Sequence, residues 1–311
     1  MEFFKRKTNI DFMGKRSRWY AISATLILAS VALLLVRGLN FGIDFTGGVV
    51  VEVSFTQTAD LDKVRGALVS KGYDDAVVQS FGTSKDVLIR LLPDGGKDVT
   101  AVSQGVLAAV KSYDPTAELR RTEVVGAQVG AELAEQGALA SLFAFLFIMG
   151  YVAMRFQWKL GVGSIVAAMH DPIIILGLFA ATQMTFDLPA LAAILAIVGY
   201  SLNDTVVVFD RIRERFVLTR KGTPAEIINL AINETLSRTL MTSVTTVTAV
   251  LSLLLIAGDM LRGFSIALLV GVVVGTYSSI YIASSIALDL KLTARDLLPV
   301  QKEKDVVDDM P

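Results

Sequence analysis

Six long stretches of this chain contain almost no charged residues, and they constrain its fold more than any other feature. A transmembrane helix needs about 20 consecutive, mostly apolar residues. Composition agrees, because 53% of the 311 residues are hydrophobic and only 19% are charged, against about 25% in soluble domains. The sequence therefore predicts a polytopic α-helical membrane protein. The predicted spans are residues 19–37, 136–154, 160–186, 188–210, 239–258 and 263–288.

The remaining composition argues against several classes of function. A formal net charge of −1 gives no global field that would attract nucleic acid. Cysteine is absent, which excludes disulfides, cysteine-ligated metals and a thiol nucleophile. His170 is the only histidine, so a multi-histidine metal site is ruled out. We expect neither a cofactor nor a metal.

Basic residues in the short loops predict the orientation. Lysine and arginine concentrate in the tail 1–18 and in the loop 211–238, where a short helix is expected to start at Pro224 and to run to about Leu236. The loops on the opposite side are nearly free of them, and such asymmetry places the basic side in the cytoplasm. Both the 1–18 and 289–311 tails should therefore be cytoplasmic. The first span is longer than a signal-peptide core and is interpreted as a permanent anchor.

Residues 38–135 have ordinary polarity and should form a small domain outside the membrane, on the periplasmic side. Alternation of apolar and polar residues predicts strands, and 3.6-residue spacing predicts helices. The order strand, helix, strand, strand, helix, strand is that of a ferredoxin-like α+β sandwich. No catalytic constellation stands out in it, so a binding or mechanical role is expected. The expected strands are 48–55, 76–81, 86–92 and 117–125, and the expected helices are 61–70 and 99–113.

Asp204 is the clearest ionisable residue within a predicted span. About sixteen uncharged residues precede it and five follow it, so it lies within the hydrocarbon, toward the cytoplasmic side. An ionised carboxylate there is costly and marks a functional residue. Such a group can load and unload a proton. The alternative is a protonated Asp204 that joins two helices through a hydrogen bond.

The fifth span offers partners for this carboxyl. Arg238 could pair with Asp204, and the hydroxyls of Thr242 and Thr246 fall on the same helical stripe and could relay a proton. Asn203, adjacent to the carboxyl, is a further candidate. The threonines have an equally simple structural interpretation, since threonine readily bonds back to its own helix.

His170, Asp171 and Pro172 interrupt the third span and form a secondary candidate site. His170 could titrate, or the pair could serve only to cap a broken helix. Asp171 and Asp204 together would suggest an intramembrane aspartyl protease. The usual sequence contexts of that class are absent, because Asp171 follows a histidine and Asp204 follows an asparagine.

Four motifs carry a resemblance to a known family. They are NFGIDFTGG at 40–48, GYSLNDTVVVFDRIRE at 199–214, NETLSRTLMTS at 233–243 and GTYSSIYIA at 275–283. In this order and at these spacings, the chain resembles the SecF branch of the SecD/SecF family of protein-export membrane subunits. The resemblance extends from about residue 9 to residue 290. That family is part of the resistance-nodulation-division superfamily.

The resemblance implies a partner and an energy source. It implies pairing with a SecD-like subunit, association with the SecYEG channel, and contact with the translocating preprotein in a bacterial inner membrane. It also implies transport driven by the proton gradient, without enzymatic chemistry, in which Asp204 carries the proton and Arg238 tunes it. A small-molecule or lipid exporter subunit of the same superfamily remains the alternative, although about ninety external residues are few for a substrate cleft.

Overall fold

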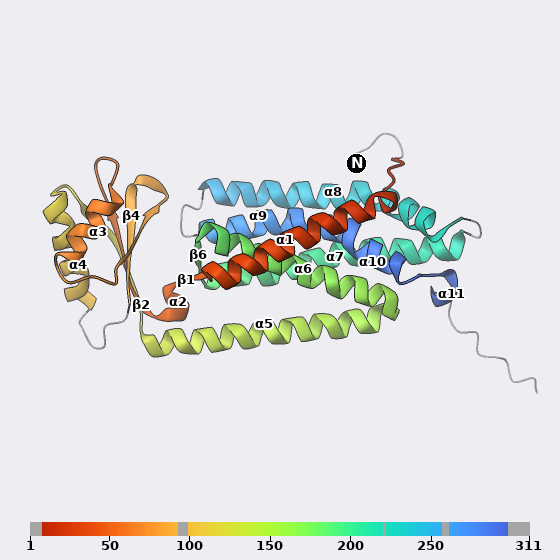
Figure 1. Cartoon of the computed structure of the whole chain (residues 1–311), viewed down its shortest axis with the longest axis horizontal. Coiled ribbons are helices and arrows are strands. Elements are labelled where there is room, and N and C mark those ends of the chain that lie inside the picture. The colour runs from red at the N-terminus through yellow and green to blue at the C-terminus, as the bar shows by residue number, and fades with distance from the viewer. Residues whose placement is uncertain (1–7, 93–98, 220–221, 257–260, 298–311) are drawn as a thin grey trace, which may run out of the picture.

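The computed structural model describes residues 8–92, 99–219, 222–256 and 261–297. Six helices are long and apolar enough to cross a membrane, and a separate α+β domain lies at one end of their bundle (Figure 1). The predicted fold class is thereby confirmed. The outer parts of the predicted tails, 1–7 and 298–311, lie outside the described residues, as do the last two residues of the predicted span 239–258.

The long helices form two layers within the bundle. Helices α6, α7 and α9 are largely buried, whereas α1, α5 and α8 lie on the outside with most of their surface exposed. The long helices are α1 (Arg16–Arg37), α5 (Ala127–Arg155), α6 (Trp158–Thr182), α7 (Leu188–Leu218), α8 (Pro224–Ile256) and α9 (Arg262–Tyr277). Helix α9 continues through a π-helical turn, η3 (Ser278–Ala283), into α10 (Ser284–Asp289). The shorter elements around the bundle are η1 (Met13–Lys15), β1 (Asn40–Phe41), α2 (Ile43–Thr46), β6 (Thr185–Phe186) and α11 (Ala294–Leu297).

Small residues allow the outer helix α1 to approach the core closely. A Cβ on Gly177 of α6 would lie 2.1 Å from the Ser30 Oγ of α1. Association of helices in a membrane depends on such close packing, because lipid gives apolar side chains no hydrophobic reason to cluster.

Two predicted boundaries differ from the structure. The segment 211–238 is not a loop with a short separate helix, because α7 continues to Leu218, and α8 starts at Pro224 as predicted but continues to Ile256 without a break. The reason is packing: Ile228 and Ile232 on this part of α8 are fully buried in a cluster with Met13. The third span ends at Thr182 rather than at 186, because Gln183 adopts a left-handed conformation and terminates α6.

The α+β domain has the predicted topology. Its strand order is β3-β4-β2-β5 with all neighbouring pairs antiparallel, which is the ferredoxin-like arrangement. Helices α3 and α4 cover the face of the sheet that points away from the bundle (Figure 1). Val51, Val53 and Ile89 are fully buried in the core beneath these helices. The elements are β2 (Gly48–Ser54), α3 (Leu61–Val69), β3 (Val77–Phe81), β4 (Thr83–Leu91), α4 (Val99–Tyr113) and β5 (Glu118–Val125).

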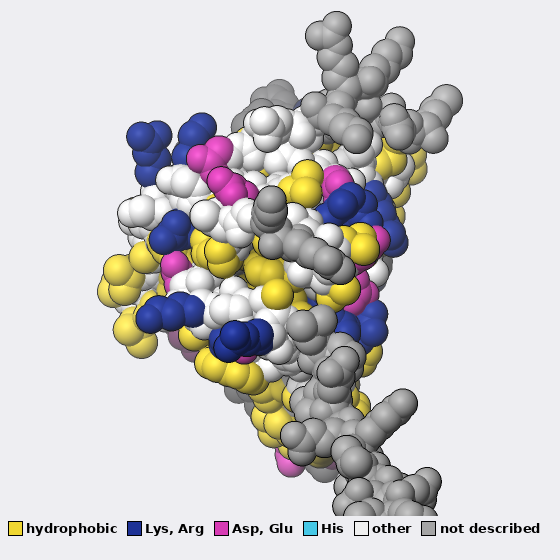
Figure 2. All heavy atoms as spheres, turned by 90° about the vertical axis from the view of Figure 1, so that its right-hand side faces the viewer, with side chains coloured by type: hydrophobic (Ala, Val, Ile, Leu, Met, Phe, Trp, Pro, Cys, Tyr) yellow, Lys and Arg dark blue, Asp and Glu magenta, His cyan; other side chains and the backbone are white. Residues whose placement is uncertain are grey.

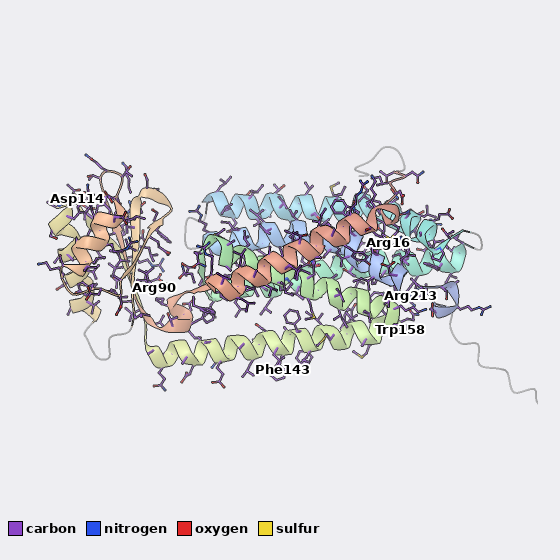
Figure 3. The ribbon with its side chains drawn as sticks, viewed as in Figure 1. Arg16, Arg90, Asp114, Phe143, Trp158 and Arg213 are labelled. Carbon is purple, nitrogen blue, oxygen red and sulfur yellow. The ribbon has the colours of Figure 1, made fainter. Side chains whose placement is uncertain are left out.

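Specific polar contacts join this domain to the bundle. Strand β1, directly after α1, pairs in parallel with β6, so that Asn40 lies opposite Thr185. Arg90 reaches from the sheet to the backbone carbonyl of Phe41 and to Asn40 Oδ1, the latter at 2.7 Å (Figure 3). Gln79 Nε2 donates to Thr185 Oγ1 at 3.2 Å. A cavity of about 430 Å³ separates the rest of the sheet face from the bundle.

Candidate functional site

Asp204 lies in the middle of α7. The helix begins after Asp187, whose carboxylate accepts a hydrogen bond from the backbone N–H of Ala190 at 2.8 Å and caps the first turn. Burial raises the pKa of Asp187, which lies just outside the span. At 1.5 Å per residue, Asp204 is about 24 Å from the start of the helix. Its carboxyl group is therefore deep in the bundle, far from both ends.

The Asp204 carboxyl is buried without a hydrogen-bond partner for Oδ2 among the described residues, and only 3% of the residue is exposed. Two nearby hydroxyls share this condition: that of Tyr200, one helical turn earlier on α7, and that of Thr239 on the adjacent helix α8. A buried polar group left without a partner costs about 1–3 kcal/mol. Several such groups on two packed helices therefore indicate a region kept for function rather than for stability.

Arg238 lies on α8, where its positive charge acts on the Asp204 carboxyl. The structure does not form the ion pair that the sequence suggested. Within the described chain, neither a salt bridge nor a hydrogen bond connects the two residues, and Arg238 is exposed. The Arg238 charge therefore acts on the Asp204 carboxyl without a direct contact.

The three other candidate relay residues have different surroundings. Thr242 and Thr246 are half-buried, and their hydroxyls donate to the carbonyls of Thr239 and Thr242, both at 2.9 Å, within their own helix. Asn203 is exposed on the outer surface of α7, although it is next to Asp204 in sequence. The structure therefore brings Arg238 toward Asp204, keeps the threonines on internal hydrogen bonds, and turns Asn203 outward.

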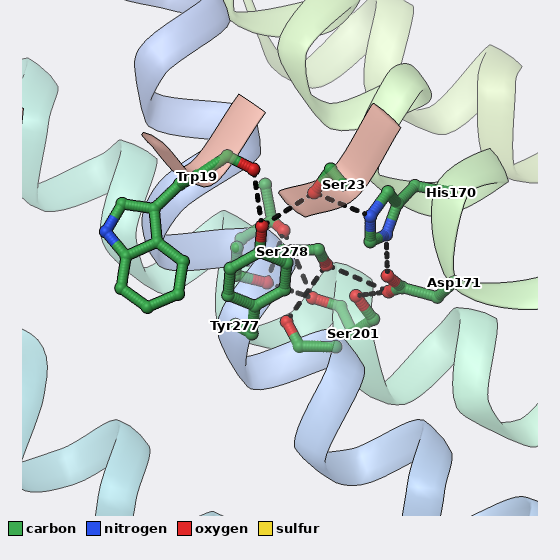
Figure 4. A network of polar contacts seen from close by, with 10 residues as sticks. Trp19, Ser23, His170, Asp171, Ser201, Tyr277 and Ser278 are labelled. Atoms are coloured by element: carbon green, nitrogen blue, oxygen red, sulfur yellow. Dashed lines mark hydrogen bonds and ion pairs between the residues drawn. The ribbon is translucent and has the colours of Figure 1, made fainter. Parts of the chain in front are cut away.

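His170 and Asp171 form part of a buried polar network (Figure 4). Asp171 is fully buried, and its Oδ2 accepts hydrogen bonds from Ser201 Oγ of α7 at 2.5 Å and from Ser278 Oγ of η3 at 3.0 Å. Its Oδ1 lies 2.9 Å from His170 Nδ1. Helix α6 is continuous through Pro172, so the pair lies within an intact helix instead of capping a broken one.

The same network reaches the outer helix α1. His170 Nε2 lies 3.1 Å from Ser23 Oγ, and this oxygen lies 2.6 Å from the Tyr277 hydroxyl. Tyr277 in turn donates to the backbone carbonyl of Trp19 at 2.9 Å. The sequence did not predict the roles of Ser23, Tyr277 or the serines around Asp171. Serines within otherwise apolar spans were the available signal.

The two buried aspartates have separate environments. No hydrogen bond joins Asp171 to Asp204 in the described chain, whereas an aspartyl protease needs two carboxyls that share a proton. Among the described residues, no group of three or more His, Asp or Glu side chains is arranged to hold a metal ion. The arrangement suits proton binding at a single carboxyl.

Comparison with known proteins identifies the family. Residues 105–293 match the family model described as protein export membrane protein SecD/SecF, C-terminal, and residues 32–59 match the SecD/SecF GG motif. The chain belongs to the SecD/SecF family. The second of these matches includes Gly48, whose φ of 124° and close approach to the Leu91 carbonyl leave no room for a Cβ.

Curated relatives extend over nearly the whole chain. The chain is 50% identical to protein translocase subunit SecF of Pseudomonas aeruginosa, over 97% of this chain and 98% of that protein. It is 46% identical to the SecF of Vibrio alginolyticus, over 100% and 99% of the two chains. The predicted family is confirmed, and so is the predicted role as a membrane subunit of the protein-export translocase.

The fold is also similar to a solved structure. SecDF from Thermus thermophilus, described as a translocon-associated membrane protein, superposes with a TM-score of 0.84 at 35% identity. A second structure of SecDF, in a super-membrane-facing form, gives a TM-score of 0.65 at 33% identity. In both cases the match covers 93% of this chain but only 40% of the SecDF chain.

Proposed function

We propose that this chain pairs with a SecD-like subunit and uses the proton gradient to promote export, with Asp204 as the proton carrier. The observation that supports this most is a buried carboxyl at mid-bundle whose Oδ2 has no hydrogen-bond partner among the described residues. Moving one charge across 100 mV yields about 2.3 kcal/mol. Since about 1.4 kcal/mol is a tenfold change in an equilibrium, one proton suffices to shift a two-state conformational equilibrium.

Two exposed polar residues support the need for a partner. Asn203 and Arg238 lie on the outer surfaces of helices that cross the membrane. Facing lipid, such side chains would be costly. A SecD-like subunit covering α7 and α8 would remove that cost and would complete the part of SecDF that this chain does not match. SecYEG and the translocating preprotein are the further partners proposed.

The distribution of basic residues supports the proposed orientation in the bacterial inner membrane. The end of the bundle opposite the α+β domain carries several groups of Lys and Arg side chains, interspersed with hydrophobic and acidic ones (Figure 2). Arg16 and Arg213 lie there (Figure 3), and by the positive-inside rule they support a cytoplasmic location of this end. Because the chain lacks cysteine, single variants Gln57→Cys and Glu214→Cys test this: an impermeant thiol reagent should label only the former from the periplasm.

The test of the proposed function is Asp204→Asn, reconstituted with the SecD-like subunit and SecYEG in vesicles. Translocation of a preprotein should lose its response to the proton gradient while the complex assembles normally. Asp210→Asn is the matched control, since Asp210 is on the same helix but is partly exposed and paired with Arg155 at 2.5 Å. Export that still follows the gradient in Asp204→Asn would overturn the proposal. A response to a sodium gradient in place of the pH gradient would reassign the ion.

A further inference from the structure

The polar chain from Trp19 to His170 determines which atom donates each hydrogen bond. The backbone carbonyl of Trp19 can only accept, so the Tyr277 hydroxyl gives its hydrogen to it. The 2.6 Å contact between Tyr277 and Ser23 must then use the Ser23 hydrogen. Ser23 has no second hydrogen to offer, so His170 Nε2 must be protonated and must donate to it.

The contact between His170 and Asp171 requires a further proton. Oδ2 of Asp171 is engaged by two serine hydroxyls, and Oδ1 lies 2.9 Å from Nδ1 of His170. That contact holds a hydrogen either on Nδ1, which makes an imidazolium beside a carboxylate, or on Oδ1, which makes a neutral imidazole beside a carboxylic acid. Both forms bind the same number of protons and leave the pair with no net charge.

A pair with one proton fewer would be unfavourable in this environment. Two lone pairs would face each other across one of the contacts, and a net negative charge would be buried. His170 is 2% exposed and Asp171 is not exposed at all, so neither effect is relieved by water. The docked position of α1 therefore holds the proton on the pair.

Helix α1 is also the element that leads into the α+β domain. It ends at Arg37 and continues through Gly38, with φ of 66°, into β1 and α2. Ser23 is its hydrogen-bonding contact with His170, and Ser30 packs against Gly177 two turns further along. A shift of α1 away from α6 would thus separate Ser23 from His170 and would move the connection to the domain.

We propose that His170 and Asp171 form a second proton-binding site, which holds its proton while Ser23 and Tyr277 keep α1 docked. When Ser23 leaves Nε2, the imidazole can direct a single proton from Nδ1 to an ionised Asp171 and release the other from Nε2. Linkage is reciprocal, so release of the proton favours the undocked position of α1. The site connects proton occupancy to the helix that carries the α+β domain, and it does not depend on the role of Asp204.

Few other charges act near the pair. Among the described residues, no Lys or Arg forms an ion pair with Asp171, so His170 is its only counter-charge. Tyr277 takes part through its hydroxyl as a hydrogen-bond partner. The other titratable groups on the elements packed around α6 include Tyr20 on α1, Tyr151 on α5, Asp204 on α7, Tyr281 on η3 and Asp289 on α10.

The first test uses the fact that His170 is the only histidine. With ¹⁵N-histidine in this chain and an unlabelled SecD-like partner in lipid vesicles, NMR reports the ring nitrogens of one residue. Near neutral pH, Nε2 should be protonated and Nδ1 should be in a strong hydrogen bond. A neutral ring with a bare Nε2 and a proton on Nδ1 would overturn the proposal, and this measurement needs no variant.

The second test removes the hydroxyl that fixes which way Ser23 donates its hydrogen bond. In Tyr277→Phe, the Ser23 hydrogen is free to point at Nε2, so a neutral ring with its proton on Nδ1 should appear at the same pH. Tyr281→Phe is the matched control, because Tyr281 packs against Trp19 through its ring and takes no part in the hydrogen-bonded chain. An unchanged histidine spectrum in Tyr277→Phe would contradict the assigned directions.

The third test measures the linkage to α1. Asparagine at 171 mimics the loaded acid, because its amide can donate to Nδ1 while its carbonyl accepts from the two serines. Hydrogen-exchange protection of α1, corrected for the intrinsic rate, should fall as pH rises in the wild-type complex and stay flat in Asp171→Asn. The same pH dependence in both would show that the pair only supports the structure. Asp204→Asn should retain the wild-type dependence, which separates this site from the proposed carrier.

Discussion

Asp171 and Asp204 are two buried aspartates on neighbouring helices, and they differ in the hydrogen bonds that their carboxyl groups make. Asp171 is surrounded by His170 and two serines that satisfy both of its oxygens. Asp204 is 3% exposed, and its Oδ2 has no partner in the described chain. A satisfied carboxyl is held in one geometry by its neighbours. A carboxyl oxygen without a hydrogen-bond partner breaks no hydrogen bond when the group gains or releases a proton, which suits a proton carrier.

The protonation of these two buried carboxyls is influenced in two different ways. For Asp171 the influence is a hydrogen-bonded chain that runs to the backbone of α1. For Asp204 it is the charge of Arg238, which acts without direct contact. The first depends on the position of a helix, and the second depends on a side chain that is exposed on the surface where a partner is proposed to bind.

The largest difference should appear when each carboxyl is removed. Asp171→Ala and Asp204→Ala leave similar cavities, but only the former deprives His170 and the serines of their partner. We expect Asp171→Ala to lower the free energy of unfolding by up to about 3 kcal/mol more than Asp204→Ala. Denaturant titration of the two variants in the same detergent measures this. Equal losses would mean that the hydrogen bonds around Asp171 contribute nothing.

A smaller effect is expected where α1 meets α6. Gly177→Ala places a Cβ 2.7 Å from the Ser30 Cα, so α1 must move outward at a cost of about 2 kcal/mol. Gly199→Ala on α7 is the control, since a Cβ there meets nothing within 4 Å. Thermal unfolding of both compares them. A stable Gly177→Ala would show that the docking of α1 is loose and would weaken its link to His170.

Removal of one donor to Asp171 should have a modest effect. Ser201→Ala deletes the hydroxyl that lies 2.5 Å from Oδ2, and a single intramolecular hydrogen bond contributes about 1 kcal/mol. Ser252→Ala is the control, because Ser252 is exposed and bonds only to the Thr248 carbonyl of its own helix. The two unfolding free energies should differ by that amount, and no difference would indicate that Ser278 alone suffices.

Arg238 should show the smallest effect on stability. Within the described parts of the chain it makes no ion pair that a lysine would break, so Arg238→Lys should change the unfolding free energy by less than about 0.5 kcal/mol. Lysine keeps the positive charge that acts on Asp204, so the export rate should stay near the wild-type rate. Arg238→Ala removes the charge and should slow export. A normal rate in Arg238→Ala would remove this residue from the mechanism.

Much of the fold could be predicted because its signals are local. The six apolar segments and the alternation in strands such as β2 depend only on nearby residues and on the solvent that each face meets. The segment 211–238 was misinterpreted because its helical continuation depends on burial against Met13, more than 200 residues away. The pattern of charged residues near a membrane surface gives no information about that tertiary contact.

The site was predictable only in part, for a similar reason. Asp204 stands out because an acidic residue in an apolar span is rare. The serine partners of His170 and Asp171 come from α1, α7 and η3, and only the packed bundle brings these serines together. The outward direction of Asn203 was equally hidden, since it depends on the rotation of α7 within the bundle.

The central claim, that Asp204 binds and releases the transported proton, is tested most directly by infrared difference spectroscopy of the complex in vesicles during a pH jump. Wild-type protein should show a carboxylic acid C=O band that appears on acidification. We expect the Asp204 component of this band to be lost in Asp204→Asn and retained in Asp171→Asn, and any component that remains in Asp204→Asn should be lost when Asp171→Asn is added. An unchanged band in Asp204→Asn, together with gradient-dependent export, would contradict the account.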